Sequence, residues 1–263
     1  MYFKDKVVWI TGASSGIGKA LAIELSKQDC KLILSSRRET VLNDVKSKCL
    51  KTSEVKVLPF DLADFDNMKP IAKKAVALFG QINILINNGG ISQRSLIVET
   101  DILVDKKLME IDYLGTVGLS KAILPHFIEQ QSGHFVTVTS LMGKFGSPYR
   151  SGYCGAKHAL HGFFDVLRME HEKDNIKVTL ICPGFVNTDV SRNALTGDGS
   201  QLNELDDATE NGLSVEEFSK KMLKAISKLQ FETYIGGKET KGILLKRFFP
   251  KLLHRVVTKS KVR

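Results

Sequence analysis

A tyrosine and a lysine stand four positions apart in the stretch SGYCGAK, at Tyr153 and Lys157. Positions i and i+4 lie on one face of a helix, so the lysine side chain can reach toward the phenol. A positive charge beside a phenol favours the phenolate and lowers a tyrosine pKa that is ordinarily about 10. The spacing therefore predicts a tyrosine able to exchange protons near neutral pH, although a chance surface pair has the same spacing.

A glycine-rich stretch, TGASSGIGKA, follows the first apolar run and opens the first helical pattern. Its glycines allow a tight turn and a close approach to a pyrophosphate, which the N-terminus of the next helix holds through its N–H groups. This position after a first strand favours a dinucleotide site over a simple tight turn. The loop residues that we assign to the cofactor are Gly12, Ser14, Ser15, Gly16, Ile17 and Gly18.

The end of the second apolar run indicates which dinucleotide is bound. An NAD-binding chain carries a carboxylate there for the ribose hydroxyls, whereas this chain has Ser36 followed by Arg37 and Arg38. Guanidinium groups match a 2′-phosphate in charge and geometry. The sequence therefore predicts NADP(H), with Arg37 the stronger candidate and Arg38 equally compatible with the start of an exposed helix.

Apolar runs typical of strands alternate with helical patterns along the chain. Several of the runs are continuous in Val, Ile and Leu, as in strands that are covered on both faces. This alternation predicts a doubly wound α/β fold with a parallel sheet and helices on both faces. The expected strands are 6–11, 31–36, 55–60, 82–87, 134–140, 176–182 and 232–236, and the expected helices lie near 16–28, 39–50, 64–79, 101–129, 153–173 and 214–229.

We expect one catalytic domain over residues 1–240, with a substrate loop at about 183–213 that lacks periodicity and carries four glycines. The first residues predict no secretory signal peptide, and no apolar run is long enough to span a bilayer. Four cysteines without disulfide-framework spacing are typical of a reducing, cytoplasmic setting. The histidines lack an accompanying metal-site motif, so no metal is expected.

The positive charge is concentrated at the end of the chain. The net charge is +9, and residues 241–263 contain eight basic side chains and no acid, so the rest of the chain is close to neutral. Large apolar residues alternate with the cations at helical spacing, which suits a membrane interface better than a nucleic acid. We therefore expect no nucleic-acid partner, and we leave peripheral membrane contact and docking on a neighbouring subunit as alternatives. Pro250 predicts two short helices in this tail.

The ordered set TGASSGIG at 11–18, NNGG at 87–90, TS at 139–140, YCGAK at 153–157 and PG at 183–184 resembles the short-chain dehydrogenase/reductase family, in its 11β-hydroxysteroid dehydrogenase-like branch. The resemblance covers residues 5 to about 235. It implies a Rossmann fold with strand order 3-2-1-4-5-6-7, a homodimer or homotetramer, and hydride transfer between NADP(H) and a carbonyl or alcohol.

The same resemblance assigns individual residues. It implies Ser140, Tyr153 and Lys157 as catalytic residues, with Tyr153 as the general acid/base and Lys157 also holding the nicotinamide ribose. For the cofactor it implies adenine contacts at Asp61 and Leu62, ribose-side contacts at Asn88, Gly89 and Gly90, and nicotinamide contacts at Pro183, Gly184, Val186 and Thr188.

Two positions depart from the family pattern. Gly89 replaces a family alanine, which leaves the backbone path open. Asp112 stands where the family usually has an asparagine that helps hold a water linking the lysine to solvent. An aspartate accepts the same hydrogen bonds, but its negative charge would partly offset the effect of Lys157 on the tyrosine.

Together these features predict an NADP(H)-dependent oxidoreductase that interconverts a carbonyl and a secondary alcohol. The alternative is a non-catalytic dinucleotide sensor on the same fold, which would have lost the tyrosine or the lysine. Large apolar side chains near the motifs suggest a lipid-like or steroid-like substrate. The side chains that we expect to line its pocket are Leu141, Met142, Phe145, Tyr149, Phe185 and Leu195.

Overall fold

A computed structural model describes residues 2–204 and 206–260. Seven strands form one parallel sheet in the order β3-β2-β1-β4-β5-β6-β7, which confirms the predicted order. The strands are β1 (Val7–Thr11), β2 (Lys31–Ser35), β3 (Val55–Val57), β4 (Ile84–Asn87), β5 (Gly133–Val138), β6 (Ile176–Pro183) and β7 (Glu232–Ile235). Strands β1, β4 and β5 are buried along their whole length because helices cover both faces.

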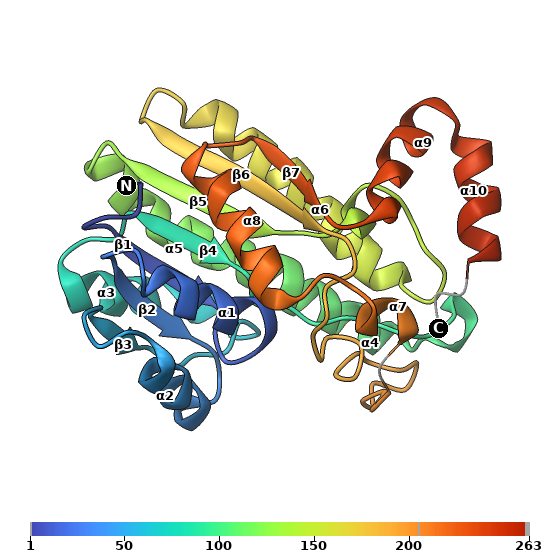
Figure 1. Ribbon diagram of the computed structural model, residues 1–263, viewed down its shortest axis with the longest axis horizontal. Coiled ribbons are helices and arrows are strands. Elements are labelled where there is room, and N and C mark those ends of the chain that lie inside the picture. Colours follow the sequence, from blue (N-terminus) through green and yellow to red (C-terminus); the bar gives the residue numbers. More distant parts are fainter. Residues whose placement is uncertain (1, 205, 261–263) are drawn as a thin grey trace.

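Two layers of helices enclose the sheet (Figure 1). One layer contains α1 (Gly16–Leu25), α2 (Glu39–Lys48) and α8 (Val215–Ser227). The other contains α3 (Met68–Phe79), α5 (Thr116–Glu129) and α6 (Ser151–Glu170). Each layer packs its apolar stripe on the sheet, so the molecule has one hydrophobic core on each side.

The predicted helix 101–129 is interrupted. The chain forms α4 (Ile102–Leu108), a π-helical segment η3 (Met109–Gly115) and then α5. Asp112 lies in this π segment and is fully buried. Because a π turn is wider than an α-helical turn, it directs inward a side chain that a regular α-helix would direct elsewhere. Such turns occur often at functional sites.

Short elements connect the strands on the carboxyl side of the sheet. These are η1 (Phe65–Asn67), η2 (Ile97–Glu99), η4 (Leu141–Gly143), α7 (Asp207–Glu210) and η5 (Lys238–Lys241). The predicted loop 183–213 is thus mostly irregular, with α7 near its end. Strand β3 is shorter than the predicted strand 55–60, because its pairing with β2 ends at Val57.

The basic tail forms two helices, α9 (Gly242–Phe248) and α10 (Pro250–Lys259). Pro250 begins the second helix, as the sequence predicts, because its fixed φ suits a first helical position and not a helix interior. In Figure 1 the two helices stand as a hairpin beyond the end of the sheet. Among the described residues, no helix is long and apolar enough to cross a membrane.

Candidate active site

The glycine loop and the end of β4 are held together at the carboxyl edge of the sheet. The hydroxyl oxygen of Thr11 accepts hydrogen bonds from the backbone N–H groups of Asn88 and Gly89, both at 3.0 Å. The Asn88 amide donates to the Thr11 carbonyl at 3.0 Å. A Cβ on Gly12, which has φ of +63°, would come within 2.7 Å of the Gly89 Cα. The positive φ and this close approach explain why position 12 needs glycine.

Other cofactor candidates surround the same edge. Thr188 approaches the glycine loop, since a Cβ on Gly16 would meet its methyl group at 3.2 Å. Leu62 packs against Gly89, and Asp61 accepts a hydrogen bond from the Ala63 N–H at 3.0 Å. Arg37 and Arg38 lie exposed just beyond β2. The Ser35 carbonyl at the end of β2 accepts a hydrogen bond from the Ala13 N–H of the glycine loop at 3.1 Å. The predicted phosphate and adenosine residues therefore share one edge of the sheet.

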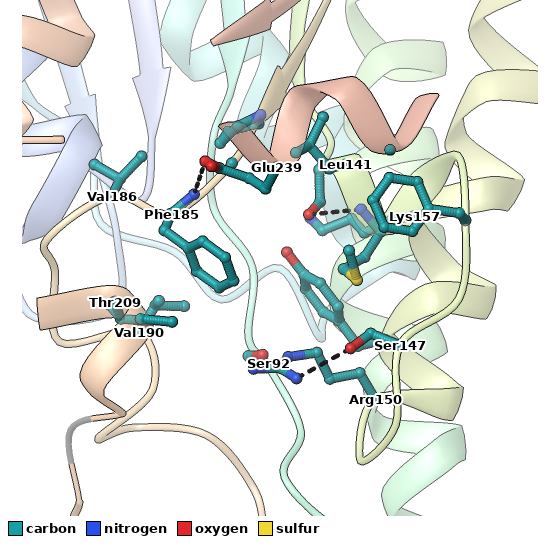
Figure 2. A pocket seen from close by; sticks show the side chains of 18 of the residues that line it. Ser92, Leu141, Ser147, Arg150, Lys157, Phe185, Val186, Val190, Thr209 and Glu239 are labelled. Atoms are coloured by element: carbon teal, nitrogen blue, oxygen red, sulfur yellow. Dashed lines mark hydrogen bonds between the residues drawn. The ribbon is translucent and has the colours of Figure 1, made fainter. Parts of the chain in front are cut away.

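A cavity of about 390 Å³ adjoins this edge. Ser140, Tyr153 and Lys157 line it, and so do the cofactor candidates Ile17, Asn88, Gly90, Pro183, Gly184, Val186 and Thr188. Figure 2 shows Phe185, Val190 and Thr209 on one wall and Ser147, Arg150 and Lys157 on the other. The structure thus brings the predicted catalytic residues and the predicted nicotinamide residues to one cavity.

Ser140 and Tyr153 are held in place by local hydrogen bonds. Ser140 follows β5 and begins η4, where its hydroxyl oxygen accepts from the Met142 N–H at 3.0 Å. Tyr153 lies in the first turn of α6. The buried Gln93 side chain accepts from the N–H groups of Gly152 and Tyr153 at 2.9 and 3.4 Å, respectively, and so fixes the start of that helix. Gln93 is a supporting residue that no sequence motif indicated.

Lys157 lies one turn beyond Tyr153, as the spacing predicts. Its ammonium is 5.6 Å from the centroid of the Tyr153 ring and 3.3 Å from a carboxylate oxygen of Asp112. Burial disfavours the ammonium, but the charges of Asp112 and Tyr153 outweigh burial and hold the pKa of Lys157 above its usual value. The lysine is therefore kept protonated beside the phenol.

Asp112 is the negative member of this buried pair. Its other carboxylate oxygen accepts from the Ile91 N–H at 2.7 Å, so the side chain also fixes the segment after β4. Complete burial raises the pKa of the Asp112 carboxyl, and the charge of Lys157 opposes that rise. The aspartate thus contacts the lysine directly, at the position where the family has an asparagine.

A second buried ion pair holds the loop 183–213, which was predicted to contact substrate, against the body of the domain. Arg94, in the segment after β4, donates to Asp206 from Nε at 3.1 Å and from Nη2 at 2.7 Å. Arg150 lies 3.6 Å from the same carboxylate oxygen, and both arginines line the cavity. Burial favours the neutral carboxyl, but hydrogen bonds from Thr209 and Arg94 hold the pKa of Asp206 below its usual value. Arg94 and Asp206 are 112 positions apart in the chain, and the sequence alone did not reveal this pair.

The predicted apolar pocket is partly correct. Leu141, Met142, Phe145 and Phe185 line the cavity. Leu195 packs instead in a small core with Val104 and Leu108. Tyr149 also lies outside the lining, in the turn before α6. The tail helices supply part of the lining in their place, through Leu245, Leu253, Val256 and Val257.

Comparison with known proteins agrees with this geometry. Residues 6–198 match the profile of the family described as short chain dehydrogenase. The chain belongs to the short-chain dehydrogenase family. Within the short-chain dehydrogenases it is 39% identical over 256 residues to dehydrogenase/reductase SDR family member 7B of Mus musculus, covering 95% of this chain and 76% of that protein. It is 42% identical over 233 residues to an SDR family protein 7-like of Anopheles gambiae, covering 86% of this chain and 74% of the relative.

Solved short-chain dehydrogenase structures share the fold. A Burkholderia phymatum short chain dehydrogenase/reductase in complex with NAD aligns with a TM-score of 0.84 at 21% identity over 96% of both chains. Levodione reductase aligns with a TM-score of 0.80 at 25% identity, over 90% of this chain and 98% of its own. As a short-chain dehydrogenase, the chain belongs to a family of oxidoreductases, and the Burkholderia phymatum structure shows a protein of this fold with NAD bound.

Proposed function

We propose that this short-chain dehydrogenase is an NADP(H)-dependent enzyme that interconverts a carbonyl and a secondary alcohol, with Tyr153 as its general acid/base. The observation that carries the proposal is the convergence of Ser140, Tyr153 and Lys157 on one cavity beside the glycine loop. Ligands of open α/β sheets bind at the carboxyl ends of the strands, which is where these residues lie.

The residues divide the chemistry of carbonyl reduction among them. Bound NADPH supplies the hydride. The Tyr153 hydroxyl donates its proton to the carbonyl oxygen, and the Lys157 ammonium stabilises the phenolate that remains. Because the Ser140 oxygen accepts from the Met142 N–H, the serine O–H is left to donate to the same carbonyl oxygen. Acid catalysis of this kind contributes about 10²–10⁴-fold, and positioning of the reactants adds to it.

Asp112 has a role different from that of the family asparagine. Its carboxylate lies 3.3 Å from the Lys157 ammonium and compensates the charge of this buried lysine. In this arrangement the aspartate holds the lysine protonated and positioned, while its second oxygen secures the strand-end segment at Ile91. Asp112 is therefore a positioning residue that acts through Lys157.

The exposed arginines after β2 support NADP(H) over NAD(H). No carboxylate occupies the position of Ser36 to accept from ribose hydroxyls, and Arg37 is free of any ion pair among the described residues. A guanidinium at this site would pair with the 2′-phosphate in two hydrogen bonds. The apolar lining from Leu141, Phe145 and Phe185 supports a lipid-like or steroid-like substrate.

A screen of ketones and secondary alcohols, followed by NADPH absorbance with NADH in parallel, tests the proposal. Turnover with NADPH that exceeds turnover with NADH is the expected result. The competing function, a non-catalytic dinucleotide sensor, predicts tight NADPH binding without turnover of any compound. We also propose a homo-oligomer, as the family resemblance implies, and sedimentation velocity measures it directly.

A further inference from the structure

The hairpin formed by α9 and α10 has two faces with different surroundings. Its inner face carries Leu245, Leu253 and Val257, which line the cavity and pack with Leu141 of η4 and with Phe145, two residues beyond η4. Leu253 is buried, and a Cβ on Gly242 would meet the Phe145 ring at 2.8 Å. The hairpin is therefore a wall of the substrate cavity, contributed by the chain itself.

The outer face of the hairpin carries an uncovered apolar stripe. Leu244 and Phe248 are four residues apart on α9, Leu252 and Val256 are four residues apart on α10, and Phe249 lies at the turn between the helices, so each pair shares a face of its own helix. Their exposed fractions lie between 48% and 65%. Val256 also lines the cavity, so the stripe runs up to the rim of the cavity.

Cations flank this stripe on both helices. The basic residues are Lys246, Arg247, Lys251, Arg255 and Lys259, all exposed. None of them forms an ion pair within residues 2–204 and 206–260, and no acidic residue follows Glu239 in the sequence. An apolar stripe bordered by uncompensated cations complements an anionic lipid surface, where the cations meet headgroups and the aromatic rings enter the acyl boundary.

The attachment of the hairpin to the body is slight. Among the described residues of the hairpin, Leu253 is the one large side chain that is buried. Segments with few buried apolar contacts open at a low free-energy cost compared with the core. A displacement of this hairpin would open the cavity beside Leu141 and Phe145 without disturbing the sheet.

We propose that the outer face of the α9–α10 hairpin docks on an anionic bilayer and that the substrate enters the cavity from that bilayer, past the hairpin. The substrate half of this inference rests on the proposed function, and the docking half does not. Phe248 and Phe249 enter the interface, the cations bind headgroups, and the rim at Val256 then faces the acyl chains. An apolar ketone dissolved in the membrane reaches Tyr153 without crossing water.

Co-sedimentation with vesicles tests the docking, and it needs no turnover. The full chain is mixed with vesicles of equal parts phosphatidylcholine and phosphatidylserine, or of phosphatidylcholine alone. Binding to the anionic vesicles alone is expected, and it should weaken as salt shortens the Debye length from about 30 Å at 0.01 M to about 3 Å at 1 M. Since each cation near an anionic surface adds about fivefold to binding, the triple variant Lys246→Gln, Arg247→Gln, Lys251→Gln should bind about 100-fold more weakly.

A matched control removes the same charge elsewhere. Lys69, Lys73 and Lys74 are exposed on α3, at the other end of the molecule, and their replacement by Gln should leave vesicle binding nearly unchanged. Equal losses in the two triple variants would overturn the docking surface. Absence of binding at low salt, together with a change of oligomeric state in the Phe248→Ser, Phe249→Ser variant, would assign the stripe to a second copy of the chain and overturn the proposal.

A photoreactive probe tests entry from the bilayer separately from catalysis. A long-chain ketone that carries a diazirine is dissolved in the anionic vesicles, and the labelled peptides are identified by mass spectrometry. Label is expected on Leu141–Gly143 and on α10, and the Lys246, Arg247, Lys251 variant should lose it. Label on the hairpin without label on the η4 segment would overturn entry from the bilayer. If NADPH oxidation is absent while labelling persists, only the proposed function fails.

Discussion

At the scale of single residues, the proposed function gives the most specific role to the hydroxyl of Tyr153. Tyr153→Phe removes that oxygen and retains the ring, so the start of α6 and its hydrogen bonds to Gln93 remain intact. We expect NADPH binding to survive, measured as a shift in thermal unfolding, while turnover falls by about 10²–10⁴-fold. A variant that keeps most of its activity on a verified ketone would show that another group donates the proton.

The pair of Asp112 and Lys157 predicts a dependence of stability on pH. Asp112→Asn retains an acceptor for the Ile91 N–H but leaves the buried Lys157 without compensation, at a cost of about 3 kcal/mol. In the wild-type protein the pKa of Lys157 is raised above 10.5, because the charges of Asp112 and Tyr153 outweigh the opposing effect of burial. A raised lysine pKa contributes stability that is complete below pH 10.5 and is lost as the pH rises through the folded-state value.

Unfolding in denaturant from pH 8 to pH 11 measures this dependence. The free energy of unfolding of the Asp112→Asn variant should fall furthest below that of the wild type at pH 8, and the difference should shrink toward pH 11. Asp105→Asn, on α4, is the matched control, and its stability difference should stay constant over the range. A deficit of Asp112→Asn that is independent of pH would mean that the aspartate does not compensate the lysine.

Cofactor preference is also decided at single residues. Arg37→Ala should lower NADPH affinity by about 1.5–3 kcal/mol, the free energy of a hydrogen bond to a charged group, and leave NADH affinity nearly unchanged. Titration calorimetry with the two dinucleotides measures the difference. Lys48→Ala, at the far end of α2, controls for the loss of one positive charge. Equal losses for NADPH and NADH in the Arg37 variant would contradict the assignment.

At the scale of elements, the substrate loop depends on one ion pair. Asp206→Asn leaves Arg94 and Arg150 beside a neutral amide, and breaking a buried pair costs about 3–5 kcal/mol. Hydrogen bonds from Thr209 and Arg94 outweigh burial and lower the pKa of Asp206. The wild-type protein should therefore have a larger free energy of unfolding than the variant above pH 3.8, and this difference should be lost as the pH falls through the lowered pKa. Limited proteolysis should then cut the variant within residues 183–213.

The control for this element is Glu204→Gln, which removes the same charge from an exposed position in the same loop. Its proteolysis pattern should match that of the wild-type protein. If Asp206→Asn also resists cleavage and unfolds at the same denaturant concentration, the ion pair does not hold the loop.

Elements that depend on local pattern were predicted well, and those that depend on distant contacts were not. The strands carry continuous apolar runs because both faces of the sheet are covered, so the runs predicted a parallel sheet, and the family resemblance implied the strand order that the structure has. Helix 101–129 was predicted as continuous, since periodicity alone does not reveal the π turn at Asp112. The third strand was predicted too long because the backbone beyond Val57 stays beside β2 through single hydrogen bonds, such as that from Phe60 N–H to the Ser36 carbonyl.

At the scale of the whole molecule, the tail shows the limit of prediction from one sequence. The spacing of its apolar residues predicted that one face of the tail is covered. A membrane and a neighbouring subunit were the two surfaces considered as its cover. The structure places Leu253 and Val257 against the cavity of the same chain. The contact joins residues more than a hundred positions apart, and no local pattern records such a pairing.

Removal of residues 243–263 tests how the tail contributes to the whole molecule. The sheet, the glycine loop and Lys157 all lie upstream, so we expect the shortened protein to fold and to bind NADPH with unchanged affinity. Loss of Leu253 and its neighbours exposes Leu141 and Phe145, which removes part of the apolar wall. The KM for long apolar ketones should therefore rise, whereas the kcat/KM for a small water-soluble ketone should change little, because the proton donor and its hydrogen bonds are retained. An equal fall in kcat/KM for both ketones would show instead that the hairpin supports the catalytic residues themselves.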